Sequence, residues 1–243
     1  MKTQHNMIAA ALTACTVLAG AATGAQAQTI VNGGFESGLF GWSAADQLGS
    51  DGTFLVQTGP TSPLNGFAVP VAPEGLNAAM TDSGAGGSHA LYQDFAVPAV
   101  VQQTFLRFSL YLNNGAEAYF VPSHLDWART SQTGGLTLNQ QARVDLLGAG
   151  TDPFSTAAGD VLANLFATTT STPAVAGYLS FDIDITAVLQ THAGETLRLR
   201  FAEVDNVNFF NLGVDNVRLV VVPAPASGAV GLALLALAGR RRR

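Results

Sequence analysis

The chain has 243 residues, of which seventeen are acidic and eleven basic, so its net charge at pH 7 is −6. Five of the basic residues lie in the end segments, at Lys2 and Arg240–Arg243. Residues 28–222 therefore carry six arginines, no lysine and a net charge of −11. This acidic body excludes nucleic acids and anionic membranes as expected partners, since both bind basic surfaces. It is compatible with divalent cations and neutral glycans.

The first 27 residues have the layout of a secretory signal peptide. Lys2 gives a weakly positive start, residues 7–22 are apolar, and Ala25-Gln26-Ala27 forms a small-residue cleavage motif. We therefore expect the protein to be exported and its mature chain to begin at Gln28. An alternative is a lipobox, Leu12-Thr13-Ala14-Cys15, whose cysteine would become a lipidated N-terminus.

Cysteine is absent from the expected mature body. Cys15 is the only cysteine of the chain and lies in the N-terminal segment. The body is therefore expected to have neither a disulfide nor a thiolate. This excludes a cysteine nucleophile and a cysteine-ligated metal.

Short β-strands dominate the body. Strand-like runs are separated by turns rich in Gly, Pro, Asn, Ser and Thr, and a helical period is confined to 157–166 and 187–192. The predicted strands are Thr53–Gln57, Ala78–Thr81, Ala90–Phe95, Thr104–Leu112, Ala142–Leu147, Gly177–Ile185, Thr196–Glu203 and Leu212–Val222. This pattern indicates an all-β fold, an antiparallel β-sandwich or jelly roll. We see no internal repeat and no dividing linker, so residues 28–222 are expected to form one domain.

Three motifs of the body place carboxylates near turns. In Asn32-Gly33-Gly34-Phe35-Glu36, two glycines allow a sharp turn that brings carbonyl oxygens close to a cation. Glu74 lies on a Pro-Gly turn, and Asp215 lies near the start of the last predicted strand. The last strand of a jelly roll can run close to the first. These carboxylates are therefore expected to reach one corner of the fold.

Further motifs follow in a recognisable order: Gly41-Trp42, Leu91–Phe95, Leu197–Glu203 and Gly213–Val217. With the opening motif they resemble the galactose-binding-like jelly roll of many carbohydrate-binding modules and bacterial surface domains, over nearly the whole body. The resemblance implies a structural Ca²⁺, for which hard oxygen ligands are suitable. The implied ligands are the backbone of Asn32 or Gly34 and the side chains of Glu36, Glu74 and Asp215. The alternative is that Glu36 and Asp215 only accept backbone hydrogen bonds or cap turns.

The segment 117–129 is a long connection with aromatic and charged residues. Tyr119, Trp127 and Arg129 are the candidate ligand-binding residues, because flat rings stack on sugars and loops on rigid scaffolds carry function. The alternative is a loop folded over a sheet with Trp127 as its plug. Trp42 is expected to be a core or edge residue.

No sequence pattern indicates an enzyme. Glycosidases need two carboxylates flanking the bond that is cleaved, and none of the acids forms a recognisable pair. The neighbouring acids considered are Asp182 with Asp184 and Glu203 with Asp205. The histidines of the body, at His89, His124 and His192, are scattered and lack a ligand spacing. Catalytic residues are therefore not predicted.

The C-terminal segment 223–243 has three parts. Val222-Pro223-Ala224-Pro225 precedes an apolar stretch, residues 229–238, and the chain ends in Arg240–Arg243. A basic cluster beside an apolar span is held on the cytoplasmic side of a membrane, and this span is shorter than the about 20 residues that a stable transmembrane helix needs. The arrangement resembles the PEP-CTERM sorting signal of Gram-negative bacteria, with Ala224 where that family usually has Glu. It implies a short hydrophobic sorting helix and removal by an exosortase-type enzyme.

Three functions remain open from the sequence. The first is an exported, non-catalytic protein of the cell envelope, cell surface or extracellular matrix of a Gram-negative bacterium, in contact with exopolysaccharide. The second is a dedicated carbohydrate-binding module with Trp127 and Tyr119 as its platform. The third is a polysaccharide hydrolase. A groove with exposed aromatic rings favours the second, and a cleft with two facing carboxylates favours the third.

Overall fold

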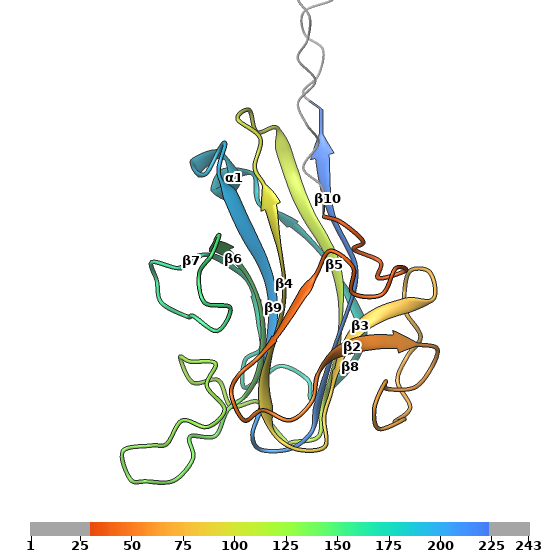
Figure 1. Ribbon diagram of the computed structural model, residues 1–243, viewed down its shortest axis with the longest axis vertical. Coiled ribbons are helices and arrows are strands. Elements are labelled where there is room, and N and C mark those ends of the chain that lie inside the picture. The colour runs from red at the N-terminus through yellow and green to blue at the C-terminus, as the bar shows by residue number, and fades with distance from the viewer. Residues whose placement is uncertain (1–29, 224–243) are drawn as a thin grey trace, which may run out of the picture.

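The computed structural model describes residues 30–223, which form two antiparallel five-stranded sheets packed face to face (Figure 1). Sheet A has the strand order β1-β4-β9-β6-β7, and sheet B has the order β2-β3-β10-β5-β8. The strands are β1 (Ser43–Asp46), β2 (Thr53–Thr58), β3 (Asn77–Asp82), β4 (Gly87–Ala96), β5 (Gln103–Asn114), β6 (Gln140–Gly148), β7 (Val161–Ala167), β8 (Val175–Asp184), β9 (Thr196–Asp205) and β10 (Phe210–Val222). The chain passes repeatedly from one sheet to the other, as in a jelly roll.

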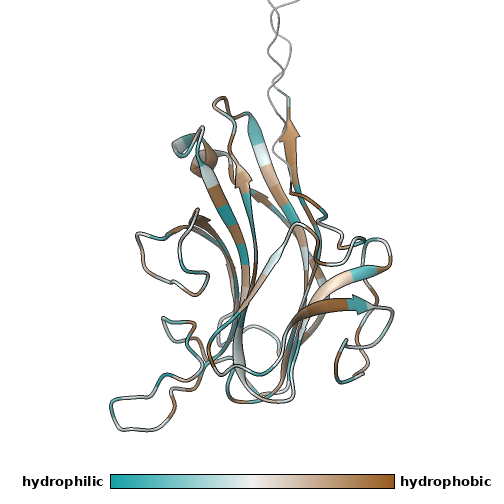
Figure 2. Cartoon of the chain, viewed as in Figure 1, coloured by the Kyte–Doolittle hydropathy of each residue, from teal (hydrophilic) through white to brown (hydrophobic). Residues whose placement is uncertain are grey.

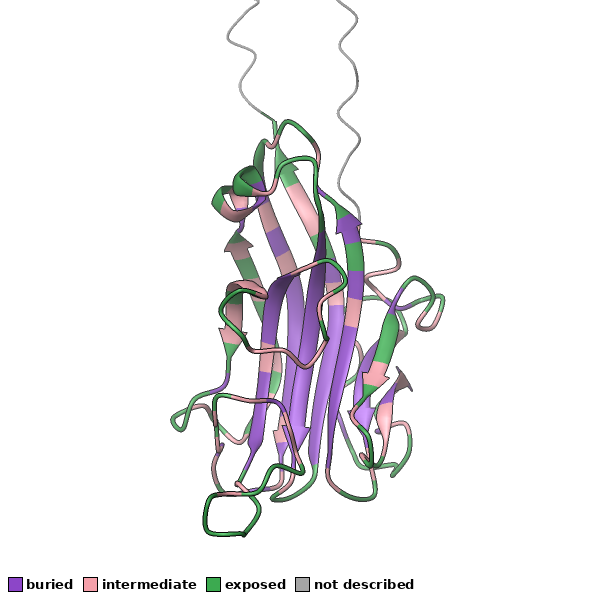
Figure 3. Ribbon diagram, turned by 60° about the vertical axis from the view of Figure 1, so that its left-hand side comes forward, coloured by how far each residue is buried: buried purple, intermediate pink, exposed green. Residues whose placement is uncertain are grey.

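The core follows from the two-residue period of the strands. In β9, Leu197, Leu199 and Phe201 belong to the buried cluster between the sheets, and Arg198 and Arg200 alternate with them. Figure 2 shows hydrophobic and hydrophilic bands alternating along the strands, and Figure 3 shows that the buried residues run along the middle of both sheets. The sandwich therefore has an apolar interior and two outer faces.

Trp42, at the end of the loop before β1, packs onto this core and holds the loop against it. Its ring centroid lies 5.4 Å from that of Phe35 and 5.9 Å from that of Phe201. The indole Nε1 donates a hydrogen bond to the carbonyl of Asn32 at 3.1 Å. The expectation that Trp42 is a core or edge residue is thus confirmed, and the residue belongs to the core.

The all-β fold and all eight predicted strands are confirmed, with bounds that differ by a few residues; Ile185, predicted to end a strand, lies just after β8. The helical period over 187–192 corresponds to the short helix α1 (Thr186–Thr191), which connects β8 to β9. The helical prediction over 157–166 was wrong, because residues 161–167 form β7 and pair with β6. Strand β1, which pairs with β4, was not predicted.

The end segments lie almost entirely outside the described residues. Of the predicted cleavage and sorting residues, Val222 ends β10 and Pro223 follows it, whereas the others fall beyond residues 30–223. These are Ala27, Gln28, Ala224, Pro225, Arg240, Arg241, Arg242 and Arg243. Within residues 30–223, no helix is long and apolar enough to cross a membrane.

Candidate functional site

Three predicted carboxylates meet at one corner, which we call the carboxylate corner and define as Glu36, Glu74 and Asp215. Glu36 lies in the loop before β1, and its Oε1 accepts hydrogen bonds from the backbone N–H groups of Leu76 at 2.8 Å and Asn77 at 2.9 Å. Asp215 lies on β10, and its Oδ2 accepts the N–H of Glu74 at 2.9 Å. The three motifs, distant in sequence, are thereby tied together.

Negative charge accumulates at this corner. Asp215 is fully buried, and burial together with the neighbouring charges of Glu74 and Glu36 raises its pKa to about 6 despite two backbone hydrogen bonds. The nearest ion-pair partner is Arg218, whose Nη1 lies 3.7 Å from Oε2 of Glu74, and both side chains are about half exposed. An exposed pair at that distance compensates little charge.

The donor set of the corner suits Ca²⁺ better than a transition metal. Carboxylate oxygens are hard ligands, and converging carboxylates are stabilised by a cation between them. Gly34 lies beside the Glu74 carboxylate: a side-chain carbon added to it would be 3.8 Å from that group. The oxygens of the three carboxylates, however, do not form a group within 4.8 Å of one another among residues 30–223. The backbone hydrogen bonds that Glu36 and Asp215 accept are those that the alternative to a calcium site expects.

Asn32, the other predicted backbone ligand, has a different role in this structure. Its carbonyl oxygen accepts the N–H of Phe35 at 3.1 Å as well as the Trp42 indole. Its side-chain amide donates to the carbonyls of Gly38 and Phe40 at 2.8 and 2.9 Å. Asn32 therefore organises the loop, and Gly34 is the better candidate for a backbone ligand.

The predicted aromatic platform does not form. Tyr119 is only 1% exposed, packs edge-on against Phe210 and donates its hydroxyl to the carbonyl of Ala174. Trp127 is half-buried against a small apolar cluster on sheet A, and Arg129 is exposed. Tyr119 therefore offers no ring face to a sugar, and the loop with Trp127 as its plug is the arrangement found.

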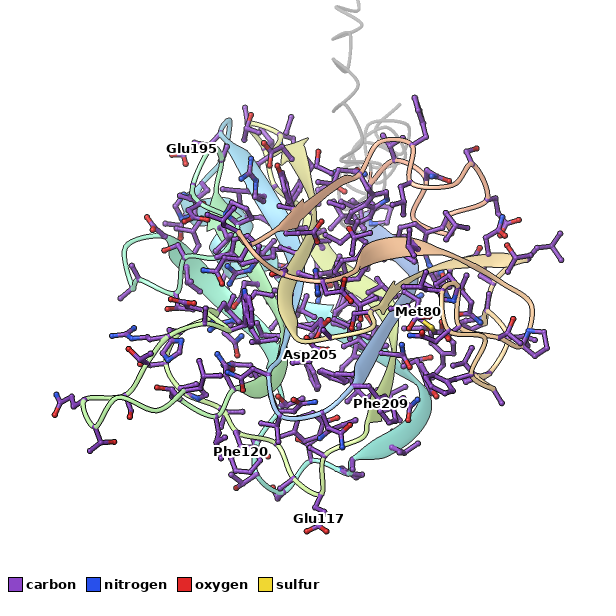
Figure 4. All side chains as sticks on the ribbon, turned by 60° about the horizontal axis from the view of Figure 1, so that its bottom comes forward. Met80, Glu117, Phe120, Glu195, Asp205 and Phe209 are labelled. Atoms are coloured by element: carbon purple, nitrogen blue, oxygen red, sulfur yellow. The ribbon has the colours of Figure 1, made fainter. Side chains whose placement is uncertain are left out.

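An open cleft lies instead at the end of the sandwich where β3 turns into β4 and β9 turns into β10. We call it the loop-end cleft and define it by the turn residues 83–86 and by residues 205–209. Its volume is about 300 Å³. Figure 4 views this end of the molecule, with Asp205 near its centre and Phe209 on the turn beside it. Asp205 is the only carboxylate in the cleft lining found within residues 30–223.

One residue of the cleft lining, Phe209, belongs to an exposed aromatic pair. Phe209 is 41% exposed, and Phe67, from the loop between β2 and β3, is 49% exposed. Their ring centroids are 5.7 Å apart. Phe209 is held in place because its carbonyl accepts the N–H of Gly115 at 2.8 Å and its ring lies directly over Gly115. Phe209 is thus a fixed aromatic residue of the cleft lining, and Phe67 packs against its ring from outside that lining.

Hardly any sequence pattern predicts this cleft. Phe67, Phe209 and the turn 83–86 are separated by long stretches, and none belongs to a predicted strand. The nearest signal is the cluster of turn residues in Ser83–Ser88, which predicts a loop and no ligand. The cleft arises only when two turns meet at one end of the sandwich.

No protein-family model matches the chain, and no curated protein does. Among solved structures, TmCBM61 in complex with β-1,4-galactotriose is similar, with 12% identity, 79% of this chain and 97% of that chain covered, and a TM-score of 0.47. The K3 adhesin domain of Lys-gingipain from Porphyromonas gingivalis has 14% identity, coverages of 80% and 99%, and a TM-score of 0.47. A Stig cyclase from Fischerella sp. TAU has 20% identity, coverages of 81% and 97%, and a TM-score of 0.44. Because all three TM-scores lie below 0.5, we infer nothing about this chain's ligand or chemistry from them.

Proposed function

We propose that this protein is an exported, non-catalytic glycan-binding β-sandwich of the bacterial cell surface or extracellular matrix. The loop-end cleft with Phe209 in its lining is the observation that carries the proposal. A volume of about 300 Å³ lies at the lower end of ordinary small-ligand sites. An aromatic face of Phe209 suits the C–H face of a sugar, and the polar backbone of the two turns suits its hydroxyl groups.

Export and sorting belong to the same proposal and rest on the end segments of the sequence. A signal peptide over 1–27 and a three-part tail over 223–243 would bring the chain to the envelope, where an exosortase-type enzyme would process it. The acidic, lysine-free body suits neutral polysaccharide better than nucleic acid or anionic lipid.

Calcium has a structural role in this proposal. Bound at the carboxylate corner, Ca²⁺ would neutralise Glu36, Glu74 and Asp215 and hold the first loop, the turn at Glu74 and β10 together. The corner and the loop-end cleft share no residue. Calcium is therefore expected to act on stability rather than to contact the glycan.

The experiment measures retention of the purified protein in gels that contain single polysaccharides. Phe209→Ala removes the aromatic ring of the cleft lining, and we expect its affinity to fall by about 10- to 100-fold, the equivalent of one buried aromatic contact. The control is Phe40→Ala, which removes another exposed phenylalanine ring, 72% exposed, that is not in the cleft lining.

Two results would count against the proposal. Phe209→Ala could retain full affinity while Trp127→Ala loses it in a folded protein, which would move the site to the 117–129 loop. Alternatively, no polysaccharide could retain the folded wild-type protein, which would leave a matrix role through protein contacts.

A further inference from the structure

Three metal-ligating side chains lie together inside the sandwich, near the loop-end cleft. His89 on β4 and Glu203 on β9 are directly opposite each other in the antiparallel register, and Asp205 lies two residues after Glu203 on the same face. Their exposed fractions are 0%, 1% and 1%. One donor atom of each residue lies within 4.8 Å of the donor atoms of the other two.

The imidazole of His89 is oriented as in metal-ligating histidines. Its Nδ1 lies 2.7 Å from Oδ1 of Asp46 on the neighbouring strand β1. Because a carboxylate accepts there, the neutral imidazole carries its proton on Nδ1 and has its lone pair on Nε2. Metal-binding histidines commonly hold their second nitrogen on a carboxylate in this way. Nε2 of His89 is buried and has no hydrogen-bond partner.

A second buried atom lacks a partner in the same cluster. Oε2 of Glu203 accepts no hydrogen bond, whereas Asp205 accepts the N–H of Gly87 at 2.6 Å and the hydroxyl of Ser83 at 3.3 Å. Buried polar atoms are nearly always satisfied, so two of them in one cluster call for a ligand. A side-chain carbon added to Gly87 would be 2.4 Å from Nε2 of His89. Gly87 therefore lies next to both Nε2 of His89 and the Asp205 carboxylate.

Among residues 30–223, no arginine forms an ion pair with either of the two carboxylates. None of the ion pairs found between residues 30 and 223 includes Glu203 or Asp205. Two carboxylates buried this close together repel each other when both are charged. A cation between them would remove this electrostatic cost.

We propose that His89, Glu203 and Asp205 bind one divalent transition-metal ion, best matched by Zn²⁺. One imidazole nitrogen with two carboxylate oxygens is a mixed donor set that suits zinc, whereas calcium takes six to eight oxygens. Asp205 is also part of the lining of the loop-end cleft, so we place the entry of the ion on that side. The site is separate from the carboxylate corner and does not rest on glycan binding.

Zinc alone is the probe for this site. The purified tag-free chain is freed of metal with a chelator, and Zn²⁺ is titrated by calorimetry, with metal content measured after dialysis. We expect one zinc ion per chain in the wild type. His89→Gln and Glu203→Gln should each weaken binding by at least about 100-fold, since even removal of an outer-shell partner costs up to that much.

The matched control is His192→Gln, which removes a histidine that also has a carboxylate partner, Glu195, at 2.9 Å but lies outside the cluster. It should leave zinc binding unchanged. Glu203→Gln also removes a buried charge, so the Tm of this variant without metal should not fall below that of the wild type. Glu203→Gln is therefore the informative variant if His89→Gln fails to fold. A wild type that takes up no zinc, or a folded Glu203→Gln protein that binds zinc as the wild type does, would overturn the proposal.

Discussion

Gly33 and Gly34 are adjacent, but only at Gly33 do the surrounding atoms leave no room for a side chain. The carbonyl of Gly33 accepts the N–H of Val217 on β10 at 2.9 Å, and a side-chain carbon added to Gly33 would be 1.8 Å from the carbonyl oxygen of Val217. At Gly34 the nearest atoms would be 3.8 Å away, which is ordinary van der Waals contact. The opening motif therefore needs its first glycine for close approach to β10.

Gly33→Ala should lower the free energy of unfolding by about 3 kcal/mol, because backbone must move to admit the methyl group. This corresponds to a fall in Tm of roughly 6–12 °C for a chain of this size. Thermal unfolding in the presence of chelator measures the effect free of calcium. Gly34→Ala is the paired control and should change the free energy by less than about 1 kcal/mol. Equal losses in both variants would refute the contact argument.

At the residue scale, the carboxylate corner could be predicted from sequence and the loop-end cleft could not. Glu36, Glu74 and Asp215 each lie at a recognisable turn or strand start, so the expected fold brings them together. Tyr119 was misjudged as a platform because a ring in a loop can point outward or into the core, and sequence alone does not say which. The pairing of His89 with Glu203 depends on strand register, which no local pattern reveals.

Between β6 and β9, a buried ion pair anchors the loop that follows β6. Asp145 and Arg200 face each other in the register and are both fully buried. The guanidinium also donates to the carbonyls of Pro153 and Ser155, each at 2.7 Å. Burial alone would raise the pKa of Asp145, but the hydrogen bonds and charges of Arg143 and Arg200 outweigh it and hold that pKa below its usual value.

Asp145→Asn should cost about 3–5 kcal/mol at pH 7, because it leaves the Arg200 charge buried without its partner. Since the folded pKa of Asp145 is lowered, the stabilisation is fully present above the unfolded value near 3.8 and is lost as pH falls below it. The difference between wild type and variant should therefore shrink below about pH 4. Chemical denaturation at several pH values measures this.

The matched control for that series is Asp182→Asn, which breaks the exposed pair with Arg107, 2.8 Å long. Exposed pairs contribute little, so a loss below about 1 kcal/mol is expected. If Asp145→Asn cost no more than Asp182→Asn, the buried pair would not be anchoring the loop.

Strands could be predicted where apolar and polar residues alternate strongly. They could not be predicted where pairing with a neighbouring strand determines the conformation. The segment 157–166 contains residues with good helix propensity. Its second half nevertheless belongs to β7, the edge strand of sheet A that pairs with β6, because sheet pairing overrides helix propensity. Strand β1 is four residues long and mostly exposed, so it has no apolar alternation to detect. Both misses concern the edges of sheet A, where one neighbouring strand determines the structure.

Over the whole molecule, the body's net charge of −11 destabilises the folded state through repulsion between its negative charges, so a bound cation should stabilise the fold. Saturating Ca²⁺ at 100 times its Kd should stabilise the fold by about 2.7 kcal/mol, which raises Tm by roughly 5–11 °C relative to chelator. Glu36→Gln should abolish this shift, because Glu36 is one of the three corner carboxylates. Glu117→Gln, which removes an exposed carboxylate outside the corner, should preserve it. A wild-type Tm that is the same in calcium and in chelator would contradict the calcium proposal.

The general architecture could be predicted from the sequence, whereas the location of the proposed ligand site could not. Eight alternating runs and their turns were enough for a two-sheet sandwich, since each run can bury only one face. The cleft depends on how two distant turns and two phenylalanines, Phe67 and Phe209, meet at one end. That information lies in the three-dimensional arrangement of the strands.

The most direct test of the glycan-binding account is chemical-shift mapping by NMR, with an oligosaccharide from whichever polysaccharide retains the protein. We predict that the largest amide shifts fall in the turn 83–86 and in residues 205–209, with Phe67 also affected. Shifts centred on Trp127 and Arg129, or spread over the outer face of either sheet, would contradict the assignment of the loop-end cleft as the glycan site.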